Sequence, residues 1–205
     1  MLRSFCPEIP GHPLHLIQRG RLRAACFFAE EDCVAYLGWL GLYAARCGCC
    51  VHAYVLMGNH VHLLLTPSRA GGVAGLMRSL GERYVRYVSE AHHRDGALWE
   101  DRYDAIPVHV ARYLLSCMRY IELNPVRARL VASPEQYRWS SFRANALGRD
   151  DPLLTPHAHY CALGRSAESR QIAYRALFAD QTPGTRDGPA TRKAGRCGRT
   201  SRYST

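Results

Sequence analysis

Two strand-like segments joined by Gly58 and Asn59 constrain the fold of this chain more than any other feature. The segments 50–57 and 60–66 are mostly apolar, and only these two turn-forming residues separate them. This spacing predicts a β-hairpin. Because alternate residues of a strand point to the same side, His60 and His62 would share one face of the hairpin and Val61 would take the other.

The two histidines of the second strand suggest a metal site. A pair of neutral imidazoles on one face supplies two of the ligands that such a site needs. The alternative is a strand whose histidines only form hydrogen bonds at a surface. A His-x-His pattern alone favours that alternative, because so short a motif often arises by chance.

The segment 113–128 has the apolar spacing of a helix, and Pro125 limits that helix on its C-terminal side. Tyr120 and Asn124 are four residues apart, so the pattern predicts that they share one helix face. A hydroxyl beside a carboxamide oxygen suits a nucleophile next to a ligand for a hard metal ion. The alternative is a tyrosine packed by its ring and an asparagine that caps the helix C-terminus.

The order of the remaining patterns predicts the fold class. We expect a strand at 14–18, a helix at 31–47 closed by Gly48, and a helix at about 73–91. Around 98–106 we expect a turn that leads into a fourth strand, and we expect shorter helices within 133–147 and at 167–178. With the hairpin, this order is the split βαβ, ferredoxin-like arrangement. The prediction is an α+β fold with an antiparallel sheet, helices on one face and extra C-terminal helices.

Length and composition divide the chain into one domain and a tail. A chain of 205 residues with 47% hydrophobic residues can bury one sizeable core. We expect this domain to span residues 1–181. The segment 182–205 has few apolar residues and six basic residues against one acidic residue, Asp187, which predicts a disordered basic tail.

The positive charge favours a nucleic-acid partner. The formal net charge is +10, and Lys193 is the only lysine. Arginine binds phosphate through two parallel hydrogen bonds and stacks on bases. A GC-rich genome would also favour arginine over lysine, but it does not explain the net charge. Arg78, Arg83 and Arg86 form a basic helix face, which is either a DNA-contacting surface or an ordinary solvated one.

Cysteine content and hydropathy predict the cellular setting. The nine cysteines are odd in number and irregular in spacing, which is typical of reduced thiols used as small apolar residues. Cys47, Cys49 and Cys50 form the only cluster, and no second cluster completes a zinc site; their role stays open. No apolar run approaches the ~20 residues that cross a bilayer, and no secretory signal is evident. We therefore expect a cytoplasmic protein without membrane contact.

Together, the histidine strand and the tyrosine helix resemble the single-tyrosine transposases. The strand is similar to their His-hydrophobic-His motif, and residues 119–128 resemble the signature helix of the REP-associated tyrosine transposases. Other matches follow in order at 10–20, 98–103, 137–142, 145–148 and 154–157, so the resemblance covers about residues 10–178. One departure is Gly58, where the family usually has proline before Asn-His.

The resemblance implies a metal-dependent DNA strand transferase. His60, His62 and Asn124 would hold a divalent metal, Mg²⁺ or Mn²⁺, and Tyr120 would be the catalytic nucleophile that forms a 5′-phosphotyrosine. The partner would be single-stranded, hairpin-forming DNA, with a monomer favoured over a dimer. His15 could equally form an ordinary hydrogen bond and is not included in the site. Six arginines are expected to contact DNA: Arg78, Arg83, Arg86, Arg102, Arg119 and Arg127.

Two other functions stay open at this stage. One is a noncatalytic nucleic-acid-binding module that keeps the fold. The other is a metal-dependent nuclease that uses water in place of the tyrosine.

Overall fold

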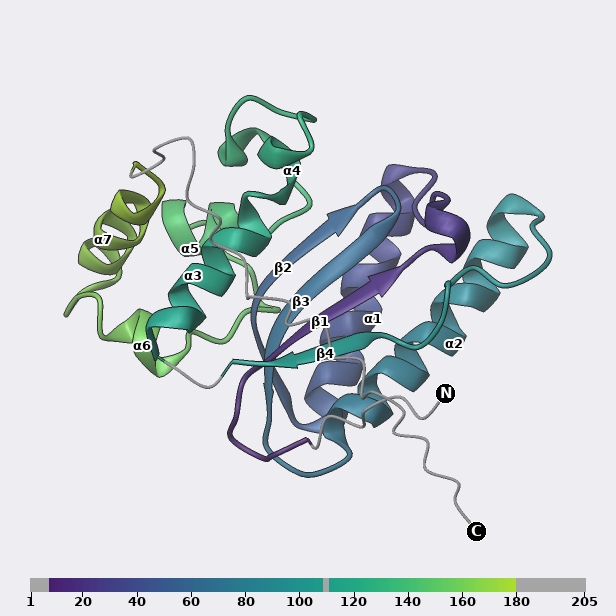
Figure 1. Cartoon of the computed structure of the whole chain (residues 1–205), viewed down its shortest axis with the longest axis horizontal. Coiled ribbons are helices and arrows are strands. Elements are labelled where there is room, and N and C mark those ends of the chain that lie inside the picture. Colours follow the sequence, from purple (N-terminus) through teal and green to yellow (C-terminus); the bar gives the residue numbers. More distant parts are fainter. Residues whose placement is uncertain (1–7, 109–110, 180–205) are drawn as a thin grey trace, which may run out of the picture.

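A four-stranded antiparallel sheet lies at the centre of the protein, as seen in a computed structural model that describes residues 8–108 and 111–179 (Figure 1). The strand order is β2-β3-β1-β4, and every neighbouring pair is antiparallel. The strands are β1 (Leu14–Arg19), β2 (Cys49–Met57), β3 (His60–Pro67) and β4 (Asp104–Pro107).

Helices cover both faces of this sheet (Figure 1). The long helices α1 (Glu30–Cys47) and α2 (Gly72–His92) pack against one face. The other face carries α3 (Ala111–Glu122), α5 (Phe142–Leu147), α6 (Ala158–Cys161) and α7 (Ala167–Ala179). The short α4 (Asn124–Arg127) follows α3, and two 3-10 turns occur, η1 (Arg21–Arg23) and η2 (Pro134–Gln136). The predicted ferredoxin-like order with extra C-terminal helices is confirmed, with α1 and α2 sharing one face.

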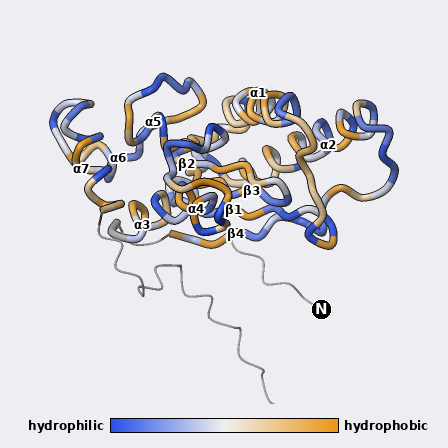
Figure 2. Tube along the Cα trace, turned by 90° about the horizontal axis from the view of Figure 1, so that it is seen from above, coloured by the Kyte–Doolittle hydropathy of each residue, from blue (hydrophilic) through white to orange (hydrophobic). Residues whose placement is uncertain are grey.

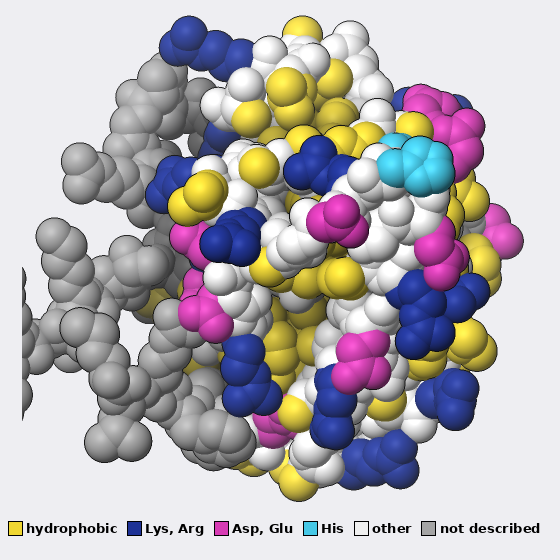
Figure 3. All heavy atoms as spheres, turned by 90° about the vertical axis from the view of Figure 1, so that its right-hand side faces the viewer, with side chains coloured by type: hydrophobic (Ala, Val, Ile, Leu, Met, Phe, Trp, Pro, Cys, Tyr) yellow, Lys and Arg dark blue, Asp and Glu magenta, His cyan; other side chains and the backbone are white. Residues whose placement is uncertain are grey.

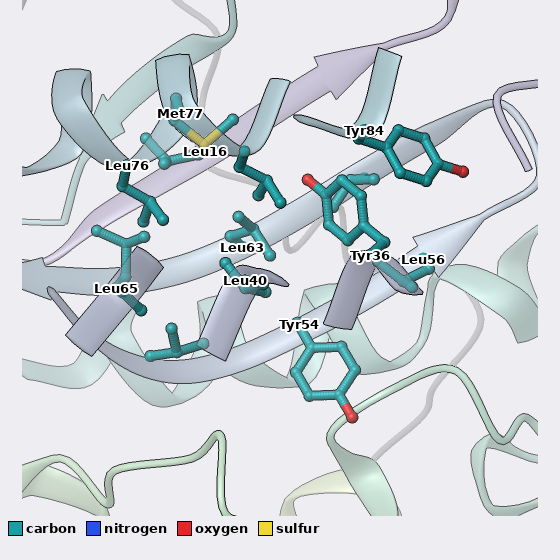
Figure 4. Packing of buried hydrophobic residues seen from close by; sticks show 14 of the residues in the cluster. Leu16, Tyr36, Leu40, Tyr54, Leu56, Leu63, Leu65, Leu76, Met77 and Tyr84 are labelled. Atoms are coloured by element: carbon teal, nitrogen blue, oxygen red, sulfur yellow. The ribbon is translucent and has the colours of Figure 1, made fainter. Parts of the chain in front are cut away.

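Alternation along β3 sends different chemistry to the two faces. Val61, Leu63 and Leu65 point to α1 and α2 and are almost fully buried there. Leu64 joins the cluster on the α3 face, and the two histidines lie on that same side. Figure 4 shows Leu63 and Leu65 among leucines and tyrosines of the α1–α2 layer. In Figure 2 the tube along α1 and α2 alternates between apolar and polar segments, as expected for helices with one covered side.

Helix α1 ends where the sequence predicted. Gly48 takes a left-handed conformation, φ 68°, and its amide donates to the carbonyls of the last helical turn. A Cβ at this position would collide with the side chain of Ser68. Glycine is therefore needed here both for the backbone conformation and for space.

The predicted turn and fourth strand are confirmed, because residues 98–103 form turns in which Trp99 makes an isolated bridge to Gly20, and β4 follows. One predicted element differs from the structure: the tyrosine helix is interrupted, so that Tyr120 lies in α3 and Asn124 begins α4. Pro125 has no backbone N–H to continue the ladder, and the Asn124 side-chain amide instead donates to the carbonyls of Tyr120 and Ile121.

A buried carboxylate fixes α3 against the C-terminal helices. Glu122 is fully buried and accepts hydrogen bonds from Ser141 Oγ at 2.6 Å, Asn145 Nδ2 at 2.8 Å and Tyr174 O–H at 2.7 Å. Burial nevertheless raises the pKa of Glu122 to about 7, against the lowering effect of the three donors. The end of the helix that carries Tyr120 is thus held by α5 and α7.

The remaining predictions on cysteines, membranes and the tail have separate outcomes. The cysteines of the described part of the chain are all free: Cys26, Cys33, Cys47, Cys49, Cys50, Cys117 and Cys161. Among the described residues, no helix combines the length and apolar character needed to span a bilayer. The predicted basic tail, 182–205, lies outside the described residues.

Candidate active site

The two histidines of β3 lie together on the sheet face that α3 covers. Their ring centroids are 5.0 Å apart, with the ring planes nearly perpendicular. His60 is opposite Met57 on β2, and His62 is opposite Val55. Met57 and Val55 both belong to the apolar cluster on the α3 face. The two histidines therefore have apolar side chains beside them on the sheet.

A third histidine, His15 on β1, completes this cluster. Its Nε2 lies 2.8 Å from Nδ1 of His62, and the two rings stack with centroids 5.0 Å apart. His15 is only 1% exposed, and its Nδ1 has no hydrogen-bond partner among the described residues. Strand register explains the contact: His15 is opposite Leu64 and His62 is opposite Ile17, so the two histidines are diagonal neighbours on one face.

Tyr120 packs against this cluster from α3. Its ring meets His62 edge-on at 5.8 Å between centroids and meets His15 edge-on at 6.0 Å. The guanidinium of Arg127 lies over the Tyr120 ring, 4.8 Å from its centroid. The structure therefore brings together the strand histidines and the predicted nucleophile from segments far apart in the chain.

A chain of hydrogen bonds sets the tautomer of His60. The Asn59 amide donates through Nδ2 to the Arg23 carbonyl at 3.1 Å, which turns its Oδ1 toward Nδ1 of His60, 2.6 Å away. A carboxamide oxygen only accepts, so Nδ1 of His60 must donate. The lone pair of Nε2 on His60 is then available to a metal ion.

The hydrogen bond between His15 and His62 can do the same for His62. When Nδ1 of His62 donates to Nε2 of His15, the Nε2 lone pair of His62 is free to bind a cation. In the opposite arrangement His15 donates, and Nε2 of His62 carries the proton. The contact thus allows the tautomer that metal binding requires.

All three imidazoles are held in the neutral form that binds metals. Burial, assisted by Arg19, lowers the pKa of His15 to about 4. Burial also lowers the pKa of His62 to about 2, because protonation beside the other two imidazoles and Arg19 would be unfavourable. Burial, assisted by Arg19 and Arg23, also lowers the pKa of His60. Proton competition for the imidazole nitrogens is therefore weak at neutral pH.

Asn124 is oriented with its oxygen available. Its Nδ2 donates to the Tyr120 carbonyl at 2.9 Å and to the Ile121 carbonyl at 3.3 Å. These contacts hold the amide nitrogen against the helix backbone, which leaves Oδ1 as the group able to bind a cation. The helix-capping alternative and the ligand prediction are compatible, because each uses a different end of the amide.

The donor set fits a divalent cation. Two imidazole nitrogens and one amide oxygen suit Mn²⁺ or Mg²⁺, which also accept phosphate and water oxygens. Among the described residues, no three His, Cys, Asp or Glu side chains are grouped to hold a metal ion. Such a site would therefore depend on the amide oxygen and on the substrate to complete its coordination.

The six arginines expected to contact DNA divide into three that lie outside α2 and three that lie on it. Of those outside α2, Arg127 belongs to the site through its contact with Tyr120. Arg119 Nη1 donates to the Leu177 carbonyl at 2.6 Å and so takes part in packing α7 on α3. Arg102 is exposed on the turn before β4.

The other group lies on α2, across the sheet from the histidines. Arg78, Arg83 and Arg86 are exposed there, and Arg83 stacks over the ring of Trp39 at 5.0 Å. Figure 3 views the right-hand side of Figure 1 and shows basic side chains scattered among acidic ones. The structure does not bring these three arginines to the site, and a DNA contact by them stays a prediction.

Sequence reasoning missed His15 as a member of the site. The available signal was its alternation with Leu14 and Leu16, which predicts that it faces away from the apolar layer. That signal could not reveal the partner, because β1 and β3 are joined only by long-range pairing.

Comparisons with known proteins show the family and the fold of this chain. Residues 9–124 match the family model described as IS200-like transposase. A solved REP-associated tyrosine transposase bound to a REP hairpin has a similar fold, with a TM-score of 0.61 and 16% identity over 77% of this chain and 93% of that chain. A structure from Deinococcus radiodurans R1, described as that of a transposase, is 21% identical over 63% of this chain and 91% of that one, with a TM-score of 0.40. No curated protein sequence matches the chain.

Proposed function

Since this chain belongs to the IS200-like transposases, we propose that it cleaves and rejoins single-stranded, hairpin-forming DNA through a covalent bond to Tyr120. The observation that carries the proposal is the contact of the Tyr120 ring with His62, at 5.8 Å between centroids, in a site whose imidazoles are held neutral. The solved protein of similar fold is bound to a REP hairpin, which supports hairpin DNA as the substrate class.

His60, His62 and Asn124 would hold the divalent cation, Mg²⁺ or Mn²⁺. When bound, that ion would polarise the scissile phosphate and help to orient it. His15 then acts as a positioning residue, because its hydrogen bond holds the ring of His62 in place and allows the tautomer that leaves Nε2 of His62 free. Asn59 has the same role for His60.

Tyr120 supplies the nucleophile. Its phenolic oxygen forms a bond to phosphorus as the bond from phosphorus to the 3′ oxygen breaks, which leaves a 5′-phosphotyrosine and a 3′ oxygen that takes up a proton. The phenol loses one proton in the same step, so charge and protons balance. The Arg127 guanidinium over the ring helps to hold Tyr120 in place through a cation–π contact. Attack by another 3′-hydroxyl reverses the reaction and joins strands without ATP.

A denaturing gel tests this function. The protein is incubated with a labelled DNA hairpin that carries single-stranded flanks, with Mn²⁺ or Mg²⁺. We expect a protein-linked DNA band that disappears in Tyr120→Phe, in His60→Ala and in His62→Ala. Tyr113→Phe, an exposed tyrosine of the same helix, is the matched control and keeps the band.

The same gel separates the two competing functions. Free cleavage products that persist in Tyr120→Phe would identify a nuclease that uses water. A mobility shift on a native gel without any cleavage would identify a binding module. The chain is proposed to act as a monomer, which light scattering of the protein–DNA complex would check.

A further inference from the structure

The turn between β1 and α1 presents a leucine to solvent. Leu22 lies in η1 and is 85% exposed, the highest value among the large hydrophobic side chains of the described residues. Arg21 and Arg23 flank it on either side and are also exposed. Single exposed apolar residues are common on protein surfaces, so exposure alone does not indicate that Leu22 has a function. Its backbone conformation and its position next to the site do.

The backbone of this turn is unusual. Leu22 has φ 52° and Arg23 has φ 59°, so two consecutive residues other than glycine occupy the left-handed region. This conformation is unfavourable for a residue with a branched side chain, and glycine or asparagine would adopt it with less strain. No packing gain offsets the strain, because the Leu22 side chain is in solvent. Strained positions of this kind cluster at functional sites.

Hydrogen bonds hold the turn in one conformation. Arg23 N donates to the Gly20 carbonyl and Ala24 N donates to the Arg21 carbonyl, both at 2.9 Å. Gly20 N donates to the Asn59 carbonyl at 2.9 Å, which fastens the turn to the β2–β3 hairpin. Glycine is required at position 20, since a Cβ there would collide with the Ala24 carbonyl. Figure 1 shows the turn after β1 beside the tip of that hairpin.

The turn also lies next to the candidate metal site. The Arg23 carbonyl accepts from Asn59, and Asn59 accepts from His60, so only one side chain separates the turn from a predicted ligand. Arg19 is opposite His60 in the β1–β3 register, and Arg23 is linked to His60 through Asn59. Arg19 is paired with Asp104 at 2.6 Å.

The charge of the turn suits a polyanion that also offers apolar surfaces. Among the described residues, the guanidinium groups of Arg21 and Arg23 make no ion pair. Glu100 and Asp101 follow on the neighbouring segment, so the turn is a small basic tip and not part of a broad basic surface. Nucleic acid fits such a tip, because phosphates alternate with stacked bases.

We propose that Leu22 is an apolar wedge that inserts between DNA bases next to the scissile phosphate, while Arg21 and Arg23 bind the flanking phosphates. Apolar side chains that open a base step in this way are a known mode of DNA contact. A strained, fastened turn is suited to the task, because a flexible one would fold the leucine back on the protein. The proposal rests on the proposed function for its substrate, single-stranded hairpin DNA.

The test compares Leu22→Asn with Leu22→Phe. Asparagine relieves the left-handed strain but removes the wedge, so we expect the thermal midpoint to rise by about 2–4 °C while DNA affinity falls about tenfold. Phenylalanine keeps an apolar side chain, and its affinity should stay within about threefold of the parent. Leu42→Asn, an exposed leucine of α1, is the matched control and should leave affinity unchanged.

Binding is measured without metal, on a hairpin with 2-aminopurine beside the expected cleavage position. Insertion of Leu22 unstacks the base, so fluorescence should rise on binding for the parent and for Leu22→Phe but not for Leu22→Asn. Equal affinity and equal fluorescence in the parent and Leu22→Asn would overturn the wedge, and so would a Leu22→Phe variant as weak as Leu22→Asn. Mn²⁺ affinity without DNA should be the same in all three proteins.

These readouts do not depend on chemistry at Tyr120. If no covalent product forms but the fluorescence and affinity differences are observed, the proposed function fails and the wedge stands. If covalent product forms and Leu22→Asn binds normally, the wedge fails and the proposed function stands.

Discussion

The two faces of the sheet are built from the same strands but bury different groups. On the α1–α2 face, residues such as Leu40, Leu63, Leu76 and Leu80 are almost completely covered. On the α3 face, His15, His62 and Glu122 are buried to a similar degree. Burying polar groups costs free energy unless hydrogen bonds compensate. The α1–α2 face therefore stabilises the fold, whereas the α3 face buries polar groups, at a cost in folding free energy, to form the candidate site.

Strand β3 contributes both to the apolar core and to the candidate site. Along β3, Val61, Leu63 and Leu65 alternate with His60 and His62, so neighbouring residues differ in role. Substitutions one residue apart should then affect different properties.

The largest difference is expected between His62→Ala and Leu63→Ala. Removing the imidazole should lower DNA cleavage by more than about a hundredfold, because a metal ligand and its partner His15 are both affected. Leu63→Ala should instead lower the free energy of unfolding by about 2–5 kcal/mol through a cavity in the α1–α2 layer. Activity is measured per folded molecule by active-site titration, and stability by urea unfolding. A catalytic loss in Leu63→Ala as large as that in His62→Ala would remove the contrast.

The next effect concerns His15, which should act only through His62. His15→Ala should weaken Mn²⁺ binding by about 10–100-fold, as expected for loss of a group that orients a ligand. His15→Gln retains an amide that can accept the His62 Nδ1–H and should restore part of the affinity. Electron paramagnetic resonance of free Mn²⁺ gives the dissociation constant without DNA. Unchanged Mn²⁺ affinity in His15→Ala would rule out the positioning role.

A smaller effect is expected from the pH dependence of Glu122. Its pKa in the folded protein is about 7, above the ordinary value of 4.5, so the folded state binds more protons than the unfolded state between these values. Stability should fall as pH rises from about 4.5 to 7, by at most roughly 3 kcal/mol from this group. Glu122→Gln should flatten this part of the profile. The measurement is chemical unfolding at pH 5, 6, 7 and 8, and a variant with the slope of the parent would contradict it.

The smallest difference separates two tyrosines on the α1–α2 face. Tyr84 O–H donates to the Cys26 carbonyl at 2.7 Å, whereas the Tyr36 hydroxyl is buried without a partner among the described residues. Tyr84→Phe should cost about 1 kcal/mol of stability. Tyr36→Phe should be neutral or slightly stabilising, because it removes an unsatisfied polar group. Thermal unfolding of both variants shows which substitution lowers stability more. A larger loss of stability in Tyr36→Phe than in Tyr84→Phe would contradict this prediction.

The sequence predicted the elements far better than their contacts. Apolar periodicity and glycine at position 48 were sufficient for the long helices and the hairpin, because these features depend on local structure. The break after Glu122 was only partly foreseen: Pro125 limited the helix, but the role of the Asn124 amide in replacing the lost donor required coordinates.

For the site, local patterns singled out His60, His62, Tyr120 and Asn124 as candidates and the family resemblance gave them roles, but neither showed their surroundings. His15 reaches His62 only through the β1–β3 register, and the tautomer of His60 depends on Asn59 and the Arg23 carbonyl. Long-range pairing of this kind leaves no periodic trace in a single sequence. The same reason explains why the strained turn at Leu22 could not be anticipated.

The central claim is that Tyr120 carries the DNA during strand transfer. Mass spectrometry of the trapped product tests it most directly: the protein is reacted with hairpin DNA and Mn²⁺, the DNA is trimmed with nuclease, and the chain is digested with trypsin. We expect the peptide from Tyr120 to Arg127 to gain the mass of a nucleotide joined through its 5′-phosphate, with the modification on the tyrosine. Cleaved DNA together with an unmodified peptide, or an adduct on another residue, would contradict it.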